Sequence, residues 1–233
     1  MYTTVQLQPE APAPSLPPRR RLHRAGITAL SALAVAGTLA ITTHGVARED
    51  TTTETYLGIR TVMLETNAGT IDVTAADGAA TTVTGTRRWS YQAPSAPPVR
   101  DGDRLTISAR CPKIEHAAGF GTSHTNYHLA VPAGVEVQVT TSAGTITGSD
   151  LPATQFAART SAGDIRLSFT GTPESVQAQS SAGDVRVAVP YGSYHVDADT
   201  ALGDVEVGVV SDPRAPRLID VHTSAGDVEV SPR

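Results

Sequence analysis

Aspartates recur at one position of a repeated motif, and a column of carboxylates is an arrangement that can hold a cation. They follow glycine in TSAGDIRL (160–167), SSAGDVRV (180–187), TALGDVEV (200–207) and TSAGDVEV (223–230), as Asp164, Asp184, Asp204 and Asp227. Calcium takes about six to eight oxygen ligands, and calcium-binding β-rolls supply them from doubled glycine-aspartate nonapeptides. Here a single Gly-Asp pair recurs, so we expect the aspartates to stabilise turns and predict no metal site.

A second group of possible ligands lies where the repeat is interrupted, and it consists of Cys111, His116, His124 and His128. Alternation along a strand would place His124 and His128 on one face and Tyr127 on the other. Their spacings of 5, 8 and 4 residues match no zinc pattern, so we expect surface or loop positions. Cys111 is the only cysteine, which excludes an intrachain disulfide.

The segment RRWSYQ (87–92) holds the only tryptophan of the chain and is the best candidate for a ligand contact. Aromatic faces bind sugars and arginines bind carboxylates, which makes Arg87, Arg88, Trp89 and Tyr91 candidate binding residues. The alternative is a bulky cap over the end of a β-stack. The sequence contains no nucleophile elbow, zinc-protease motif or phosphate-binding loop, so we predict no catalytic residue and no cofactor.

These residues are carried by a repeat of nearly fixed period. Its turn glycines follow one another at steps of 19, 20, 20 and 23 residues, as Gly144, Gly163, Gly183, Gly203 and Gly226. Weaker copies stand at TNAGTIDV (66–73) and TSAGTITG (141–148). Apolar residues alternate after each glycine, which predicts two short strands per unit joined by a tight turn. Glycine supplies a positive φ there, and the following aspartate can bond its own nearby backbone.

Two arrangements of these strands fit the pattern. Units stacked in parallel about 4.8 Å apart would bury their aliphatic rows against one another, and an antiparallel meander would do the same. If the units stack in chain order, the outward positions align as Arg166, Arg186, Glu206 and Glu229. Arg186 would then neighbour Glu206.

Serial T-S-A-G-D-[IV]-x-V units, preceded by the corners VPAG (131–134) and VPYG (189–192), resemble the toastrack domain, a bacterial β-repeat family also described as adhesins. The resemblance covers roughly residues 57 to 230, and the repeat is lost between residues 87 and 128. It implies a rack of stacked β-strands, attached in many members to a membrane segment, that serves envelope sensing or surface interaction. It implies no catalytic residues.

The amino-terminal region differs from the rest in charge and hydropathy. Residues 1–50 carry five arginines and three acidic residues, whereas the remainder has thirteen basic and twenty acidic residues, a balance that disfavours nucleic acid as a partner. A proline-rich tail (1–24) precedes an apolar run (25–47) that is long enough to cross a bilayer. The run is either a retained anchor with its arginines in the cytoplasm or a cleaved signal peptide. The single lysine, Lys113, is typical of GC-rich, actinobacterial composition.

Together these patterns predict an all-β protein, a β-solenoid of toastrack type preceded by one transmembrane or signal helix. The expected divisions are a disordered cytoplasmic tail (1–24), the anchor or signal (25–47), a linker (48–56) and the repeat domain (57–233). We expect a non-catalytic extracytoplasmic module for envelope sensing or scaffolding that contacts membrane or envelope proteins. A secreted adhesin or glycan-binding protein is the alternative, and a polysaccharide-acting enzyme is less favoured because only fold analogy suggests it.

Overall fold

The computed structural model describes residues 48–89, 97–109 and 124–233, and the regular elements of this part are all β-strands. Within it, none of the secondary structure is a helix of the length and apolarity that a bilayer crossing requires. The predicted tail (1–24) and anchor or signal helix (25–47) lie outside the described residues.

The strands in chain order are β1 (Arg48–Leu57), β2 (Thr61–Ala68), β3 (Ile71–Ala75), β4 (Ala80–Trp89), β5 (Val99–Asp101), β6 (Arg104–Ala109), β7 (His124–Val131), β8 (Glu136–Ala143), β9 (Ile146–Leu151), β10 (Gln155–Ala162), β11 (Ile165–Phe169), β12 (Ser175–Ser180), β13 (Val185–Val189), β14 (Ser193–Thr200), β15 (Val205–Val207), β16 (Val210–Ser211), β17 (Leu218–Thr223) and β18 (Val228–Pro232). They form two nine-stranded sheets. The first has the order β1-β4-β7-β3-β9-β11-β13-β18-β15, and the second has the order β16-β14-β17-β12-β10-β8-β2-β6-β5.

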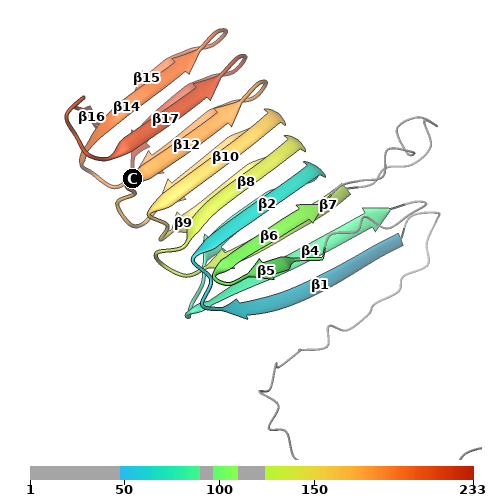
Figure 1. Ribbon diagram of the computed structural model, residues 1–233. Coiled ribbons are helices and arrows are strands. Elements are labelled where there is room, and N and C mark those ends of the chain that lie inside the picture. The colour runs from blue at the N-terminus through green and yellow to red at the C-terminus, as the bar shows by residue number, and fades with distance from the viewer. Residues whose placement is uncertain (1–47, 90–96, 110–123) are drawn as a thin grey trace, which may run out of the picture. The chain divides into compact units, whose positions relative to one another are not determined.

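Each repeat unit gives one strand to each sheet, and successive units stack in parallel (Figure 1). In the second sheet Phe156 pairs with Val176, and in the first sheet Ile165 pairs with Val185. The turn glycine joins the two strands of a unit. Of the two predicted arrangements, the structure therefore has the parallel stack and not the antiparallel meander. Antiparallel pairs occur in the described part only among β1, β4 and β7 and between β5 and β6.

The core is a thin layer of small aliphatic side chains between the two sheets. Ile165, Leu167, Val185 and Val187 are at most 2% exposed, as the strand alternation predicts. Some aromatic side chains also enter the core, and the rings of Phe156 and Phe169 meet edge to face with centroids 6.1 Å apart. Burial of these rows is the main favourable term for the stack, because no single layer could bury its own apolar face.

The last two units do not stack in chain order. Strand β18 lies between β13 and β15, so the outward column reads Arg166, Arg186, Glu229 and Glu206. The predicted neighbour of Arg186 is therefore wrong, and Arg186 Nε lies 3.5 Å from Glu229 Oε2. The cause is the long connection 208–217, which gives the chain the length to return and insert its final unit. The step of 23 residues before Gly226 is longer than the other steps of 19 and 20 residues because it includes this connection.

Strand β1 replaces the predicted linker 48–56. Its backbone pairs with β4 over ten residues, from Arg48 opposite Trp89 to Leu57 opposite Ala80. Threonine hydroxyls meet across this ladder, with Thr51 Oγ1 3.2 Å from Thr86 Oγ1. β-branched residues and cross-strand pairs of this kind favour a strand, which is why a polar segment is ordered here.

The two V-P-x-G corners differ. Gly134 has a φ of +79°, so a positive φ explains glycine in VPAG. Gly192 of VPYG is not in that region, so a positive φ does not explain glycine at this corner. A Cβ there would lie 3.4 Å from the ring of the fully buried Tyr194, which is ordinary van der Waals contact, so close packing does not require glycine at this corner either.

Candidate functional site

The turn glycines form a column in which each stands directly against the next layer. All five have φ between +137° and +146°. A Cβ on Gly183 would lie 2.2 Å from the carbonyl oxygen of Gly163, and one on Gly163 would lie 2.2 Å from that of Gly144. Two separate requirements, backbone conformation and interlayer spacing, therefore exclude any side chain at these positions.

The aspartates form a second column, and they bond between layers instead of to their own backbone. The backbone N–H of Asp184 donates to Asp164 Oδ1 at 3.0 Å, that of Asp227 donates to Asp184 Oδ1 at 3.0 Å, and that of Asp204 donates to Asp227 Oδ1 at 3.0 Å. Arg186 Nη2 lies 2.9 Å from Asp184 Oδ2. The bond from the Asp227 N–H, with a smaller contribution from Arg186, holds the pKa of Asp184 below its usual value despite partial burial.

A third column was missed by the sequence reasoning. A threonine or serine stands three residues before each turn glycine. In the four layers of Gly163, Gly183, Gly203 and Gly226 this residue donates its hydroxyl to the glycine carbonyl of the neighbouring layer, whereas Thr141 donates to Ala143 O of its own layer. Thr160 Oγ1 reaches Gly144 O at 3.2 Å, and Thr223 Oγ1 reaches Gly183 O at 2.9 Å. Recurrence of Thr or Ser at this fixed offset was the available signal.

The structure describes two of the four candidate metal ligands, His124 and His128. On β7, His124 is half-buried and His128 exposed while Tyr127 is buried, which matches the predicted alternation. Cys111 and His116 lie outside the described residues. Within the described ranges no group of three or more His, Cys, Asp or Glu side chains is placed to hold a metal ion.

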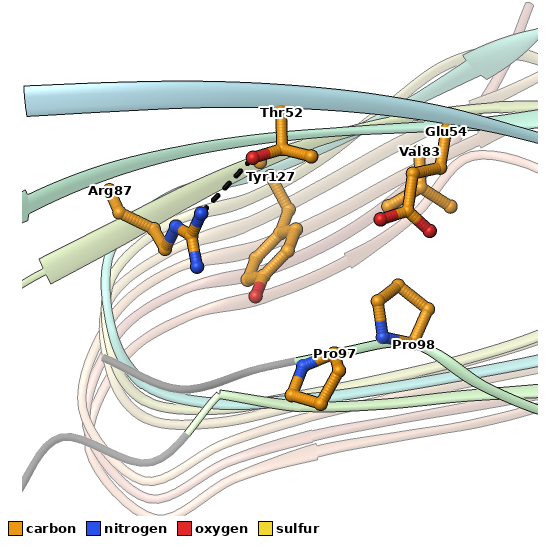
Figure 2. Close-up of a pocket in the computed structure, with 8 residues that line it drawn as sticks. Thr52, Glu54, Val83, Arg87, Pro97, Pro98 and Tyr127 are labelled. Atoms are coloured by element: carbon orange, nitrogen blue, oxygen red, sulfur yellow. Dashed lines mark hydrogen bonds between the residues drawn. The ribbon is translucent and has the colours of Figure 1, made fainter. Parts of the chain in front are cut away.

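A hollow of about 310 Å³ lies beside β1, β4 and β7, at the end of the stack that carries the antiparallel strands. Figure 2 shows Tyr127 between Arg87 and Glu54, with Pro97 and Pro98 on the opposite side. Its wall therefore combines an aromatic ring, a guanidinium and a carboxylate, which are groups that recognise small polar ligands.

Of the predicted binding residues that the structure describes, Arg87 lines this hollow. Arg87 Nη2 lies 2.6 Å from Asp50 Oδ2 and donates to Thr52 Oγ1 at 3.1 Å (Figure 2). Arg88 Nη2 lies 2.8 Å from Glu49 Oε2. The two arginines therefore tie β4 to β1.

Trp89 is not among the described residues that line the hollow. Trp89 ends β4 opposite Arg48, and Tyr91 lies outside the described residues.

Burial and a carboxylate perturb one tyrosine near this hollow. The Tyr56 hydroxyl donates to Glu54 Oε2, and burial, followed by that hydrogen bond and the charge of Glu54, raises the pKa of Tyr56 above its usual value. Tyr56 is thus a fixed neutral donor that orients Glu54.

We call β1, β4 and β5, together with this hollow, the capped end.

The opposite end is formed by β14, β15 and β16, and we call it the open end. Most exposed large hydrophobic side chains of the described chain are in or beside these strands: Tyr191, Leu202, Val205, Val207 and Val210. In Figure 1 β14 and β15 follow β17 at the far end of the ladder from β1. The open end therefore leaves apolar side chains uncovered.

The comparisons agree with this architecture. The family model Toastrack DUF4097 matches residues 50–231. A crystal structure of a candidate cell adhesion protein from Clostridium sporogenes ATCC 15579 superposes with a TM-score of 0.57 at 12% identity, covering 79% of this chain and 100% of that one. At this identity the likeness shows a shared fold alone.

A candidate adhesin from Bacteroides fragilis NCTC 9343 matches with a TM-score of 0.36 at 11% identity, covering 78% of this chain and 97% of that one. The comparison with curated proteins finds no match.

Proposed function

The chain belongs to the Toastrack DUF4097 family, and we propose that it is a non-catalytic module for envelope sensing or scaffolding through protein-protein contacts. The observation that carries the proposal is the open end, where Val205 and Val207 are exposed on β15, the outermost strand of its sheet in the described part of the chain, and Leu202 is exposed just before that strand. Exposed apolar surface next to a free edge is typical of an interaction site. The side chains of the repeated Thr and Asp residues and the backbone of the repeated glycines contact the neighbouring layers, which indicates that the repeat is a structural frame.

The cellular side on which the module acts is part of the proposal. The apolar run 25–47 follows four arginines, a pattern that keeps the amino terminus in the cytoplasm and places the following domain outside. In this proposal the run is retained as a single-pass anchor and the partner is a membrane or envelope protein. Cleavage of the run as a signal peptide would instead release the domain.

In-cell photo-crosslinking tests this function. A photoreactive amino acid is placed in the full chain either at Leu202, at the open end, or at Leu57, at the capped end; both side chains are exposed. We expect covalent adducts with membrane or envelope proteins from position 202, with residues 1–47 still present on the bait. Position 57 is the matched control. Absence of protein adducts from both positions would overturn the proposal.

A second function, glycan binding by an adhesin, is favoured by the hollow at the capped end. Tyr127, Arg87 and Glu54 line this hollow with an aromatic ring, a cation and an anion that a glycan could contact. Titration of soluble wall glycan fragments would then perturb the full chain, and Arg87→Ala would weaken that binding at least about tenfold, the loss expected for a charge-assisted contact. Arg159→Ala, on the outer face of β10, is the control. Equal binding by both variants would remove this candidate.

A further inference from the structure

The final layer of the stack exposes positions that every inner layer buries. Val205 and Val207 are 44% and 39% exposed, whereas Val185 and Val187, at the equivalent positions of an inner layer, are at most 1% exposed. In the second sheet Val196 is also only partly buried. The open end is thus a cross-section of the core that one more strand in each sheet would cover.

The backbone at this end is prepared for a further strand. Asp204 O and Gly208 N bond to β18, so the alternation of a strand turns the N–H and C=O groups of Val205 and Val207 to the outer side. Strand β15 is the last strand of its sheet in the described chain. Such a row of unpaired groups is a template for strand addition.

The interlayer columns also stop at this end. Asp227 accepts the backbone N–H of Asp204, but Asp204 accepts none from a further layer within the described residues. Gly226 O receives the hydroxyl of Thr200 at 2.9 Å, and the carbonyl of Gly203 has no such donor among those residues. A strand added on the outer side of β15 would therefore meet acceptors that each inner layer satisfies.

Charge selects the kind of strand. Going outward along the first sheet, Arg186 is followed by Glu229 and then by Glu206, which has no ion-pair partner among the described residues. In the second sheet Asp197 stands directly opposite Asp220. Like charges in neighbouring strands are unfavourable, and a basic residue on the next strand would relieve them.

We propose that the open end binds an extended segment of a partner protein in which aliphatic and basic residues alternate, by addition as a strand to the outer edge of β15. The aliphatic side chains cover Val205 and Val207, and a basic side chain lies opposite Glu206. The basic residues Arg214 and Arg217 stand in the connection between β16 and β17, outside β14 and β15.

Other occupants fit less well. Two open ends facing each other would place Glu206 beside its copy, and the edge of β1 in a second copy carries Glu49, Asp50 and Glu54 against Arg48. An anionic membrane surface would be repelled by the same carboxylates. Charge complementarity therefore favours a basic strand of another protein over a second copy or a lipid surface.

The inference rests on the proposed function, because it names the partner chemistry of the same surface. The test uses the full chain of 233 residues and a fluorescent synthetic peptide, SGSVRVRVSG, followed by anisotropy. An acidic peptide, SGSVEVEVSG, and a proline peptide, SGSVRPRVSG, are the ligand controls. We expect saturable binding of the first peptide that is at least about tenfold tighter than that of either control.

Two variants locate the contact. Glu206→Lys should lower the affinity for the basic peptide at least about tenfold and raise the affinity for the acidic peptide. Val207→Pro removes an outward N–H on an edge strand, where proline is tolerated. It should abolish the binding of both the basic and the acidic peptide. Leu57→Lys, at the capped end, should bind like the parent chain, and thermal unfolding checks that all three variants are folded.

The outcomes separate this inference from the proposed function. If the crosslinker at position 202 captures envelope proteins but the three peptides bind equally or not at all, the basic-strand inference fails while the proposed function stands. Dimers in light scattering that Val207→Pro dissolves would overturn it in favour of a second copy. Failure of both the crosslinking and the peptide binding would overturn both.

Discussion

The two ends of the stack differ in how far their outermost strands cover the apolar core. At the capped end, β1 and β4 turn antiparallel, and the ion pairs of Arg87 with Asp50 and of Arg88 with Glu49 hold a polar outer strand in place. At the open end, β15 continues the parallel repeat with three exposed residues and leaves Val205 and Val207 uncovered.

An isolated stack needs two caps, because each end is a strand edge that can recruit other chains. Natural proteins protect such edges with charge, proline or bulges, and β1 follows that rule with its threonines and charged residues. Strand β15 is short and carries one charge, Glu206, but it leaves Val205 and Val207 exposed, so the apolar core is covered at the capped end and uncovered at the open end.

The largest loss of stability is expected from a substitution in the column of turn glycines, which runs through the layers between the two ends. Gly183→Val places a Cβ 2.2 Å from Gly163 O at a φ of +139°, so the stack should lose about 4 kcal/mol or more and fail to fold. Circular dichroism and chemical unfolding would measure the loss.

Gly171→Val is the matched control for that variant. No atom lies within 4 Å of a Cβ at Gly171, and its φ is not in the positive region, so its free energy of unfolding should change by less than about 0.5 kcal/mol. A folded Gly183→Val protein with normal stability would contradict the glycine column.

The next effect compares the two ends of one aliphatic row. Val187→Ala should cost about 1.5 to 3 kcal/mol because the side chain is buried, whereas Val207→Ala at the open end should cost well under 1 kcal/mol because 39% of that residue is exposed. Urea unfolding of both variants measures the difference. Equal costs would mean that the open end is covered in solution, for example by a second copy of the chain.

The repeated part of the fold was predictable, because period and alternation constrain each layer. Glycines at steps near twenty and alternating valines were sufficient for two strands per unit and a buried aliphatic row. The order of the final two layers was not predictable from that pattern, because Val205 and Val228 occupy equivalent positions and either could pair with Val185. Only the length of the connection 208–217 distinguished them.

The candidate site was less accessible to sequence reasoning. Arg87 was identified from its neighbours in RRWSYQ, but its pairing with Asp50 depends on a segment that polar composition marked as a linker. The open end carried no motif of its own, since TALGDVEV resembles the buried copies. Its exposure follows from its place as the last layer, which requires the strand order.

A smaller difference separates the aspartates of an inner layer and the open end. Asp184 accepts an N–H from the next layer, and Asp204 accepts none within the part of the chain that the structure describes, so Asp184→Ala should cost about 1 kcal/mol and Asp204→Ala a few tenths at neutral pH. The pKa of Asp184 is lowered in the folded state, so its stabilisation is present above its unfolded pKa of about 3.9 and is lost as pH falls through the folded value.

Unfolding at about pH 7 and pH 3 checks this comparison. The cost of Asp184→Ala should shrink toward the lower pH, whereas Asp184→Asn keeps the shape and an acceptor and should show a smaller cost at neutral pH. A cost for Asp184→Ala that grows on acidification has the wrong sign for a depressed pKa and would refute the aspartate column.

The smallest effect concerns the capped end itself. The Arg87–Asp50 pair is about one quarter exposed on each side, so Arg87→Ala should lower the free energy of unfolding by only about 0 to 1 kcal/mol. Its consequence should be local, with faster amide hydrogen exchange in β1 and unchanged exchange in β14 and β15. Arg159→Ala, which removes contacts to Gln179 on an inner strand, should leave β1 unchanged. If Arg87→Ala instead accelerates exchange at both ends, the ends are coupled through the stack, and the capped end cannot be treated as an independent closure.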